Sequence, residues 1–467
     1  MLRYQTLAAI VRQQIQQGSL RAGKRIASIR QLAQQHGVSA ATAVQACLQL
    51  EREGLVLARP RLGYYVRESA RPLMPVNAPV RRPAYISNPA LFDLMLVEEG
   101  RKVLPLHVAR PAAALLPEAT LAAAMSRCLR RQRSDALAYA PPQGYWPLRQ
   151  QIARRYASIG VTVAAEEIII TAGAMEAITL ALRVLTRPGD LVLLETPTYH
   201  GILQTVATLG LQVVELPLGA GGQLDTVLLE QLLAAQPVRA AVLVPNFSNP
   251  LGVALDDTAK QALLAACARH GTVIIEDDIY GDLAWDDSRP APLRRWDSGS
   301  GVISCSSFSK SLAPGLRVGW LVGGAWTDDL SRAKFFSTVG NAPLPQMALC
   351  DYLQRHDLER HLRKLRRALA GNALQMREAI DRHWPPGTRM GEPRGGLSLW
   401  VQLPAGATAP ALFDAALERH IGLMPGQVFS SAGDYADHVR LSCGLPWDAT
   451  LAAAMVCLGE LVGKQAS

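Results

Sequence analysis

The sequence has few aromatic side chains, few charged ones and no long apolar run. Aromatic residues make up 6% and charged residues 19% of the 467 residues, whereas 49% are hydrophobic. This composition is typical of a globular chain long enough for two or three domains. No stretch reaches the roughly 18 uninterrupted apolar residues of a membrane-spanning helix, and the first residues lack the apolar centre of a signal peptide. We therefore expect a cytoplasmic protein.

Cysteine and histidine are too scattered for a disulfide framework or a metal site. The seven cysteines form no C-x-x-C pair and are an odd number, which favours free thiols in a reducing compartment. His356 and His361 are five residues apart, which is not the spacing of two metal ligands on one helix. No metal is expected.

Acidic side chains are scarce in the first 83 residues, which hold 13 Lys and Arg against 3 Asp and Glu. Their net charge is +10, whereas the whole chain carries +9, so the remainder is close to neutral. A small basic module joined to a large neutral one is typical of a protein that contacts nucleic-acid phosphates. A solvated basic face would carry the same charge, so the fold of the module has to decide.

Residues 1–68 show three helical apolar patterns followed by two short strand-like pieces. Ser28 is placed to cap the second helix, and Ser39 is placed to cap the third. The turn at Gly37 joins these two helices into a helix-turn-helix, whose last helix would enter the major groove of DNA. Residues 55–66 then predict a two-stranded wing.

This stretch resembles the winged-helix domain of GntR-type regulators. The resemblance rests on G-x-L-x-x-G at 18–23, S-I-R-Q-L-A at 28–33, V-S-A-A-T-A-V at 38–44 and L-E-R-E-G-L-V at 50–56. It implies DNA contacts from five residues, the last two on the wing: Arg30, Ser39, Thr42, Arg59 and Arg61. Ala27 stands in place of the family's usual proline and Ala40 in place of a basic residue, so the operator preference is open.

A stretch rich in proline and arginine, residues 69–92, follows this module. It is too poor in apolar residues for a core, so a semi-extended linker is expected. From residue 93 to 467, strand-like runs alternate with amphipathic helices, which predicts an α/β domain with a mostly parallel central sheet and helices on both faces. Its larger part is expected at about 130–335, and a smaller α+β part at about 340–467 together with 104–130.

Small or polar residues follow five of the predicted strands at the point where each strand ends. They are Ala172-Gly173-Ala174-Met175, the run from Glu195 to Tyr199, the run from Pro245 to Asn249, the run from Glu276 to Tyr280, and the run from Ser307 to Lys310. Because ligands of parallel sheets collect at the carboxyl ends of the strands, these runs predict one shared ligand site.

Lys310 stands at the last of these strand ends, in the run Ser-Phe-Ser-Lys-Ser, and Arg317 follows seven residues later. A lysine among hydroxyls, with no neighbouring carboxylate, suits a Schiff base to an aldehyde cofactor whose phosphate the serines and the arginine hold. The alternative is an ordinary surface loop with a solvated lysine. The aromatic, amide and carboxylate residues at the earlier strand ends favour the cofactor site.

From about Leu104 to the end, the sequence resembles a fold-type I pyridoxal-phosphate enzyme of the aminotransferase class. The resemblance implies that Lys310 forms the internal aldimine and that Asp277 pairs with the pyridine nitrogen. It implies that Tyr280 and Asn249 hydrogen-bond the phenolic oxygen of the cofactor, with Tyr280 joining Lys310 and Asp277 as a catalytic residue. Asp278 in place of Asp277 is the alternative reading of the acidic run.

The same resemblance implies the remaining ligand contacts. Tyr199 stacks on the cofactor ring, and the phosphate end of the cofactor is held by Gly173, Ala174, Met175, Ser307, Ser309 and Arg317. Tyr139 resembles the tyrosine that reaches the phosphate from the partner subunit. Arg440 resembles the arginine that clamps a substrate carboxylate through two hydrogen bonds. Val108-Ala109-Arg110 departs from the family's usual glycine beside the substrate, which leaves the substrate geometry open.

The run at 359–367, E-R-H-L-R-K-L-R-R, is basic and amphipathic. It indicates a solvated helix face, and the alternative is a second DNA contact.

A GntR-like reader followed by an aminotransferase-like domain is the architecture of MocR-type regulators, which the chain resembles over essentially its whole length. The resemblance implies a homodimer on operator DNA, with domains that can be exchanged between subunits. The cofactor is pyridoxal 5'-phosphate, and the signal is an amino compound or the cofactor itself, sensed by external aldimine formation at Lys310. The alternative is an active class I/II aminotransferase with an accessory DNA-binding domain.

Overall fold

The computed structural model describes residues 3–16, 20, 24, 26–52, 56–59, 63–66, 80–83, 92–93, 103–219, 221–286, 288–297 and 301–466. The chain divides into two compact units, Met1–Pro75 and Val76–Ser467, and each is considered by itself. Among the helices described, none is long and apolar enough to cross a membrane.

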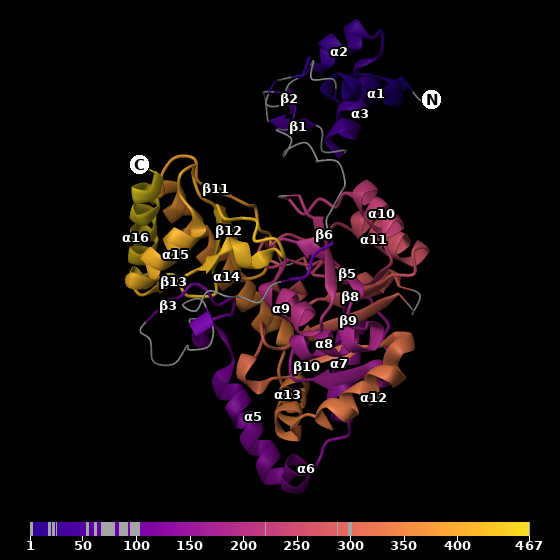
Figure 1. The fold of residues 1–467 in the computed structure, drawn as a ribbon, viewed down its shortest axis with the longest axis vertical. Coiled ribbons are helices and arrows are strands. Elements are labelled where there is room, and N and C mark those ends of the chain that lie inside the picture. Colours follow the sequence, from indigo (N-terminus) through magenta and orange to yellow (C-terminus); the bar gives the residue numbers. More distant parts are fainter. Residues whose placement is uncertain are drawn as a thin grey trace. The chain divides into compact units, whose positions relative to one another are not determined.

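The first unit is a three-helix core with a two-stranded wing (Figure 1). Its elements are α1 (Arg3–Gln16), α2 (Ile29–Gln35), α3 (Ala40–Arg52), β1 (Val56–Arg59) and β2 (Gly63–Val66). The strands pair antiparallel, with Val56 opposite Val66. Leu7, Leu32 and Leu50 are buried together, one from each helix. The predicted winged helix-turn-helix is confirmed.

Two serines begin the helices of the helix-turn-helix as the sequence predicts. Ser28 Oγ accepts from the Gln31 amide at 3.3 Å while Gln31 Oε1 accepts from the Ser28 amide at 2.9 Å, which is a complete capping box. Ser39 Oγ accepts from the Thr42 amide at 3.1 Å. Gly37, at φ +59°, forms the turn after α2 in a conformation that side chains disfavour.

A seven-stranded sheet organises the second unit, in the order β4-β10-β9-β8-β7-β5-β6. The strands are β4 (Ile168–Thr171), β5 (Leu191–Thr196), β6 (Gln212–Pro217), β7 (Val238–Leu243), β8 (Val273–Asp277), β9 (Val302–Ser307) and β10 (Gly319–Val322). Of these strands, β10 alone runs antiparallel to its neighbours. The mostly parallel sheet is therefore confirmed.

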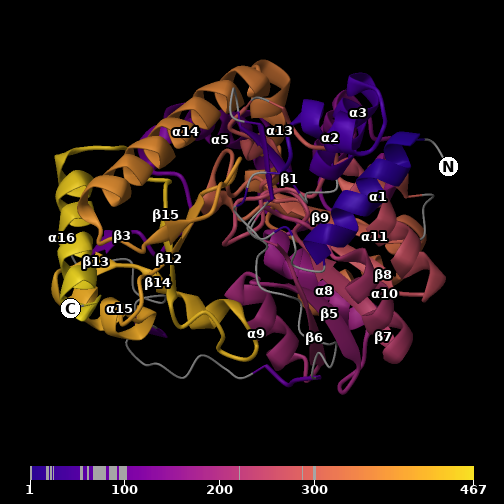
Figure 2. The same cartoon turned by 90° about the horizontal axis from the view of Figure 1, so that it is seen from above.

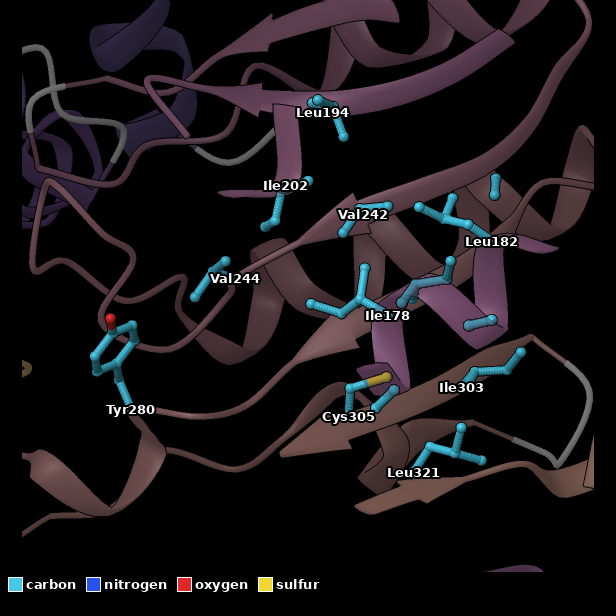
Figure 3. Close-up of a cluster of buried hydrophobic side chains, with 14 of the residues drawn as sticks. Ile178, Leu182, Leu194, Ile202, Val242, Val244, Tyr280, Ile303, Cys305 and Leu321 are labelled. Carbon is cyan, nitrogen blue, oxygen red and sulfur yellow. The ribbon is translucent and has the colours of Figure 1, made fainter. Parts of the chain in front are cut away.

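Helices cover both faces of this sheet because its central strands are buried on both sides. On one face, α8 (Ala174–Leu185) and α9 (His200–Thr208) pack on the strands, and Figure 3 shows Ile178 and Leu182 of α8 beside Val242 and Ile303. On the other face lie α10 (Thr226–Ala235) and α11 (Asp257–Arg269). Successive residues of one strand divide between the two cores: Leu193 faces α10 and α11, and Leu194 faces α8 and α9.

A third helical layer packs against β4 and β10. It comprises α5 (Glu118–Arg131), α6 (Arg133–Leu137), α7 (Trp146–Ser158), α12 (Thr327–Thr338) and α13 (Pro343–Arg355). Leu121 of α5 and Leu349 of α13 share one core with Leu148 of α7 and Ile168 of β4. The sequence reading placed α5 and α13 in the smaller part. They pack with the larger part because their apolar faces meet α7.

The smaller part is a second core around a four-stranded antiparallel sheet, ordered β11-β12-β15-β14. Its strands are β11 (Arg389–Met390), β12 (Ser398–Gln402), β14 (Met424–Pro425) and β15 (His438–Ser442), and its helices are α15 (Ala409–Glu418) and α16 (Ala449–Ala466). A separate parallel pair joins β3 (Leu104–Pro105) to β13 (Ile421–Gly422). The segment that follows β3 is thereby tied to the smaller part.

Helix α14 (Leu358–His383) connects the two cores. Leu365 and Leu369 belong to the core beneath the large sheet, whereas Met376 and Ile380 belong to the core of the smaller part. Figure 2 shows this long helix running towards α16. A shift of the smaller part would therefore reach the larger one through a single rigid helix.

The end of the expected linker is attached to the sheet. Arg81 pairs with Val213 of the edge strand β6 through two backbone hydrogen bonds of 2.8 Å. An edge strand offers unpaired backbone groups, and residues 80–83 use them instead of remaining a free tether. Apart from residues 92–93, the rest of the expected linker lies outside the described residues.

Candidate functional site

The strand ends of the large sheet open into a cavity of about 310 Å³. Most of the predicted cofactor and ligand residues line it: Ala174, Met175, Tyr199, Asn249, Asp277, Tyr280, Ser307, Ser309, Lys310, Arg317 and Arg440. Figure 3 shows the Tyr280 ring at the end of the buried core, beyond Val244. The structure therefore brings together residues separated by up to 266 positions in the sequence, from Ala174 to Arg440.

Lys310 follows β9 and is partly buried in this cavity. Its Nζ donates to the Ala109 carbonyl at 2.7 Å. Burial, assisted by the positive charge of Arg440, lowers the pKa of Lys310 to about 8. An appreciable fraction of this amine is therefore neutral near pH 7, as a nucleophile must be.

Asp277, at the end of β8, is the carboxylate that faces the cavity. Burial raises the pKa of Asp277 to about 7, against a hydrogen bond of 3.2 Å from the Ile279 amide. Asp278 does not line the cavity: it accepts from Asn246 Nδ2 at 2.8 Å and from Arg289 Nη2 at 2.5 Å. The two carboxylates project to opposite sides, as successive side chains of a strand do.

The ring end of the cavity fits pyridoxal phosphate. Asp277 accepts one hydrogen bond from the described chain, which leaves capacity for a protonated ring nitrogen. Ser398 Oγ donates to Asn249 Oδ1 at 3.4 Å, while Asn249 Nδ2 is buried and donates to no described residue, so it can reach a ligand oxygen. Burial raises the pKa of Tyr280 above its usual range, which keeps its hydroxyl protonated as a donor.

The opposite end of the cavity fits a phosphate. Gly173 has φ +94°, and a Cβ there would lie 2.5 Å from Arg317 Nη2, so the guanidinium needs a glycine at this point. Arg317 also donates to the Ala172 carbonyl at 2.8 Å and to Ser309 Oγ at 3.3 Å. These groups surround the first turn of α8, whose free amides and positive dipole end favour an anion.

Arg440 provides a second positive charge in the cavity. It is 1% exposed on β15, and its guanidinium carbon lies 5.7 Å from the centroid of the Phe429 ring. Burial lowers the pKa of Arg440 to about 10, so the side chain remains charged. Its Nη2 donates to the His107 carbonyl, and no described carboxylate pairs with it.

One segment therefore holds both cations of the cavity: His107 accepts from Arg440 and Ala109 accepts from Lys310. The segment is fixed to the smaller part on both sides of these contacts. The Ser442 amide donates to the Leu106 carbonyl at 2.8 Å, and the Ala112 amide donates to the Gly444 carbonyl at 2.9 Å. A ligand that takes either cation must break a bond to a segment of the smaller part.

Sequence reasoning missed several residues that line the cavity: His107, His200, Val244, Ile279 and Met424. His200 directly follows Tyr199, and their ring centroids are 4.5 Å apart, so its place after a strand was a usable signal. Burial, and secondarily Arg440, lowers the pKa of His200 to about 3, which makes it neutral. His107 and Met424 belong to segments without a motif.

Tyr139 is not at the cavity of its own chain and is 92% exposed. Its predicted contact is with the phosphate of a partner subunit, so this role stays a prediction.

The predicted DNA contacts also stay predictions. Arg30 is exposed on α2. Ser39 Oγ lies 2.8 Å from Thr42 Oγ1 at the start of α3. Arg59 ends β1, and Arg61 lies outside the described residues.

Comparisons with known proteins divide the chain at the same place as its architecture. The profile of aminotransferase class I and II matches residues 101–455, and that of the bacterial regulatory proteins of the gntR family matches residues 3–66. The uncharacterized HTH-type transcriptional regulator YjiR of Escherichia coli K12 is 35% identical over 99% of both chains. A 2-aminoadipate transaminase of Thermus thermophilus is 34% identical over 75% of this chain and 87% of its own.

A solved structure shows the same fold with a ligand. It is the α-aminoadipate aminotransferase LysN of Thermus thermophilus, complexed with N-(5'-phosphopyridoxyl)-L-leucine. It superposes with a TM-score of 0.74 at 32% identity and covers 81% of this chain and 96% of its own. The chain belongs to the MocR-type regulators, in which a GntR helix-turn-helix precedes an aminotransferase class I and II domain that uses pyridoxal phosphate.

Proposed function

We propose that the chain is a transcriptional regulator that changes its DNA binding when an amino compound with a carboxylate enters the cavity. One observation carries the proposal: Lys310 and Arg440 lie in one cavity, and both are held by carbonyls of a segment tied to the smaller part. An amine and a carboxylate on one ligand would compete for these two cations together.

The cavity residues divide the cofactor between them. When bound, pyridoxal phosphate supplies an aldehyde that reacts with amines and a ring that withdraws electrons. Lys310 is the attachment point, and Asp277 balances the charge of the ring nitrogen. Asn249 and Tyr280 hold the ring oxygen, and Tyr199 covers one ring face. The phosphate is held by Gly173, Ala174, Met175, Ser307, Ser309 and Arg317.

Recognition of the ligand then changes the contacts of the segment after β3. The ligand amine takes the place of Lys310, whose pKa of about 8 lets it accept a proton. Arg440 turns both N–H groups of one edge towards the carboxylate and gives up the His107 carbonyl. The segment is released from both cations, and the smaller part, to which it is tied, can change its position. Ligand binding thus shifts the population of two arrangements.

A homodimer would present two readers to two half-sites of an operator in the cytoplasm. Arg30, Ser39 and Thr42 would contact the groove and its phosphates, and Arg59 and Arg61 would contact phosphates from the wing. Tyr139, at 92% exposure, is free in the single chain to reach the phosphate site of a partner subunit.

The test combines cofactor absorbance with DNA binding. Titrating the holoprotein with a panel of amino acids should change the visible cofactor band and the affinity for a duplex from upstream of its own gene. Lys310→Ala should lose both responses, and Arg30→Ala should weaken the complex without changing the band. Arg183→Ala, an exposed arginine far from both sites in sequence, is the matched control. A complex that is insensitive to every ligand and to Arg30→Ala would refute the proposal.

An aminotransferase is the second candidate, favoured by the completeness of the cavity and by the similarity to a transaminase. Steady turnover of amino-acid and 2-oxo-acid pairs at about 1 per second or faster would make catalysis the main role. Under the regulatory proposal, turnover stays far below that rate while the spectral response persists.

A further inference from the structure

The first half of α14 carries a row of unpaired positive charges. Four cations of this helix are exposed and form no ion pair within the described residues: Arg360, Arg363, Lys364 and Arg367. At 100° per residue they fall within about a third of the helix circumference. We call these four residues the basic stripe. The stripe ends abruptly, because Gly371 and Leu374 occupy the next two positions of the same face.

This arrangement works against the stability of the helix. Four pairs in the stripe are like charges three or four residues apart, and each costs about 0.2–0.5 kcal/mol. Arg360 also lies in the first turn, where the helix dipole disfavours a cation. The nearby Glu359 does not offset the stripe, because its carboxylate pairs with the buried Arg366 at 2.5 Å. A local rule broken without compensation within the chain suggests a function.

The partner must be a polyanion rather than a bilayer. The apolar face of α14, with Leu362, Leu365 and Leu369, is buried, so this half of the helix has no apolar surface to insert among lipids. Arg360 and Arg367 are about 10 Å apart along the axis, a length of duplex that carries about six phosphate charges. The chain already contains a DNA reader, which would bring duplex DNA to the molecule.

We propose that the basic stripe binds the phosphates of duplex DNA flanking the operator site of the readers. The proposal rests on the proposed function, because the readers bring the DNA. It assigns to the aminotransferase-like unit a contact with DNA that is independent of base sequence.

The stripe lies next to the cofactor loop. His361 Nε2 is 2.7 Å from the carbonyl oxygen of Ser311, the residue after Lys310. Arg366, on the same half of α14, donates to the Asp282 carbonyl at 2.7 Å. A change at Lys310 therefore reaches the stripe through one residue of the loop and one of the helix. The flanking contact is a route by which cavity occupancy changes DNA affinity.

The experiment compares two duplexes with the full-length holoprotein. The short duplex, about 25 base pairs, covers the readers' site, and the long one, about 60 base pairs, adds flanking DNA on both sides. The stripe variant is Arg360→Gln, Arg363→Gln, Lys364→Gln and Arg367→Gln, which keeps helix propensity. The control variant removes the same charge from exposed positions on other elements: Arg183→Gln, Arg187→Gln, Arg239→Gln and Arg419→Gln.

On the long duplex, the stripe variant should bind at least about tenfold more weakly, and the slope of log affinity against log salt should fall by about 0.9 for each lost phosphate contact. On the short duplex, stripe variant and wild type should bind alike, and the control variant should match wild type on both.

Other results overturn the inference. Equal binding of stripe variant and wild type to the long duplex, or an equal loss in the control variant, would show that the stripe is a solvated face. A loss seen only with phosphatidylserine vesicles would assign it to a membrane. If wild type bound neither duplex, the proposed function would fail as well, whereas normal short-duplex binding with no flank effect would refute only the stripe.

Discussion

Replacing Arg440 with methionine should stabilise the cofactor-free protein while abolishing recognition of carboxylates. The guanidinium is buried without an acidic partner, and burial lowers its pKa to about 10. A folded-state pKa below the unfolded value means that the charged form is the costly one, and this cost is fully present at every pH below about 10. From that pKa, the cost is about 3 kcal/mol.

Two contacts offset part of this cost. The hydrogen bond to the His107 carbonyl contributes about 1.5 kcal/mol, and the Phe429 ring contributes about 0.5–1 kcal/mol. Arg440→Met, which fills a similar volume, should therefore raise the free energy of unfolding by about 1 kcal/mol, in line with other buried charges replaced by apolar residues. Thermal unfolding of the cofactor-free variant should shift upwards by about 2 °C.

Ligand titration of the holoprotein supplies the second half of the test. Arg440→Met should weaken binding of an amino acid by roughly 30-fold or more, because a buried charge pair loses one partner. The matching amine without the carboxylate should bind wild type and variant alike. Arg440→Lys is the control, since it keeps the charge but not the planar pair of donors. A fall in unfolding temperature for Arg440→Met, or an equal loss for amine and amino acid, would refute the reasoning.

Three further changes test the cavity and the reader. Because burial raises the pKa of Asp277 to about 7, above its unfolded value, its contribution to stability is lost as the pH rises from about 4 to 7; Asp277→Asn should therefore stabilise the cofactor-free protein at pH 8 but not at pH 4, by thermal unfolding. Gly173→Ala places a Cβ against Arg317 and should weaken cofactor retention at least about tenfold in a dialysis assay, with an unchanged circular dichroism spectrum. Ser28→Ala removes the capping box and should cost about 1 kcal/mol, seen as faster hydrogen exchange in α2 of the full chain, whereas Ser28→Asp should restore protection.

Local patterns located the elements and the order of the site along the chain. The caps at Ser28 and Ser39 depend on residues within three positions, so the sequence alone identifies them. The strands of the large sheet are apolar runs between helical patterns, and in a parallel sheet their carboxyl ends must meet at one edge. That is why Tyr199, Asp277 and Lys310 could be assigned to one site from the sequence.

Tertiary structure alone decided which groups hold the charged side chains. Backbone carbonyls have no sequence signature, so nothing in the sequence indicated that His107 and Ala109 would accept from Arg440 and Lys310, more than 200 residues away. The placement of α5 with the larger part, and the exposure of the stripe on α14, likewise depend on which apolar faces meet in packing. The sequence determines what each segment can form. The contacts among remote segments decide which cations a ligand must capture, because only packing sets their neighbours.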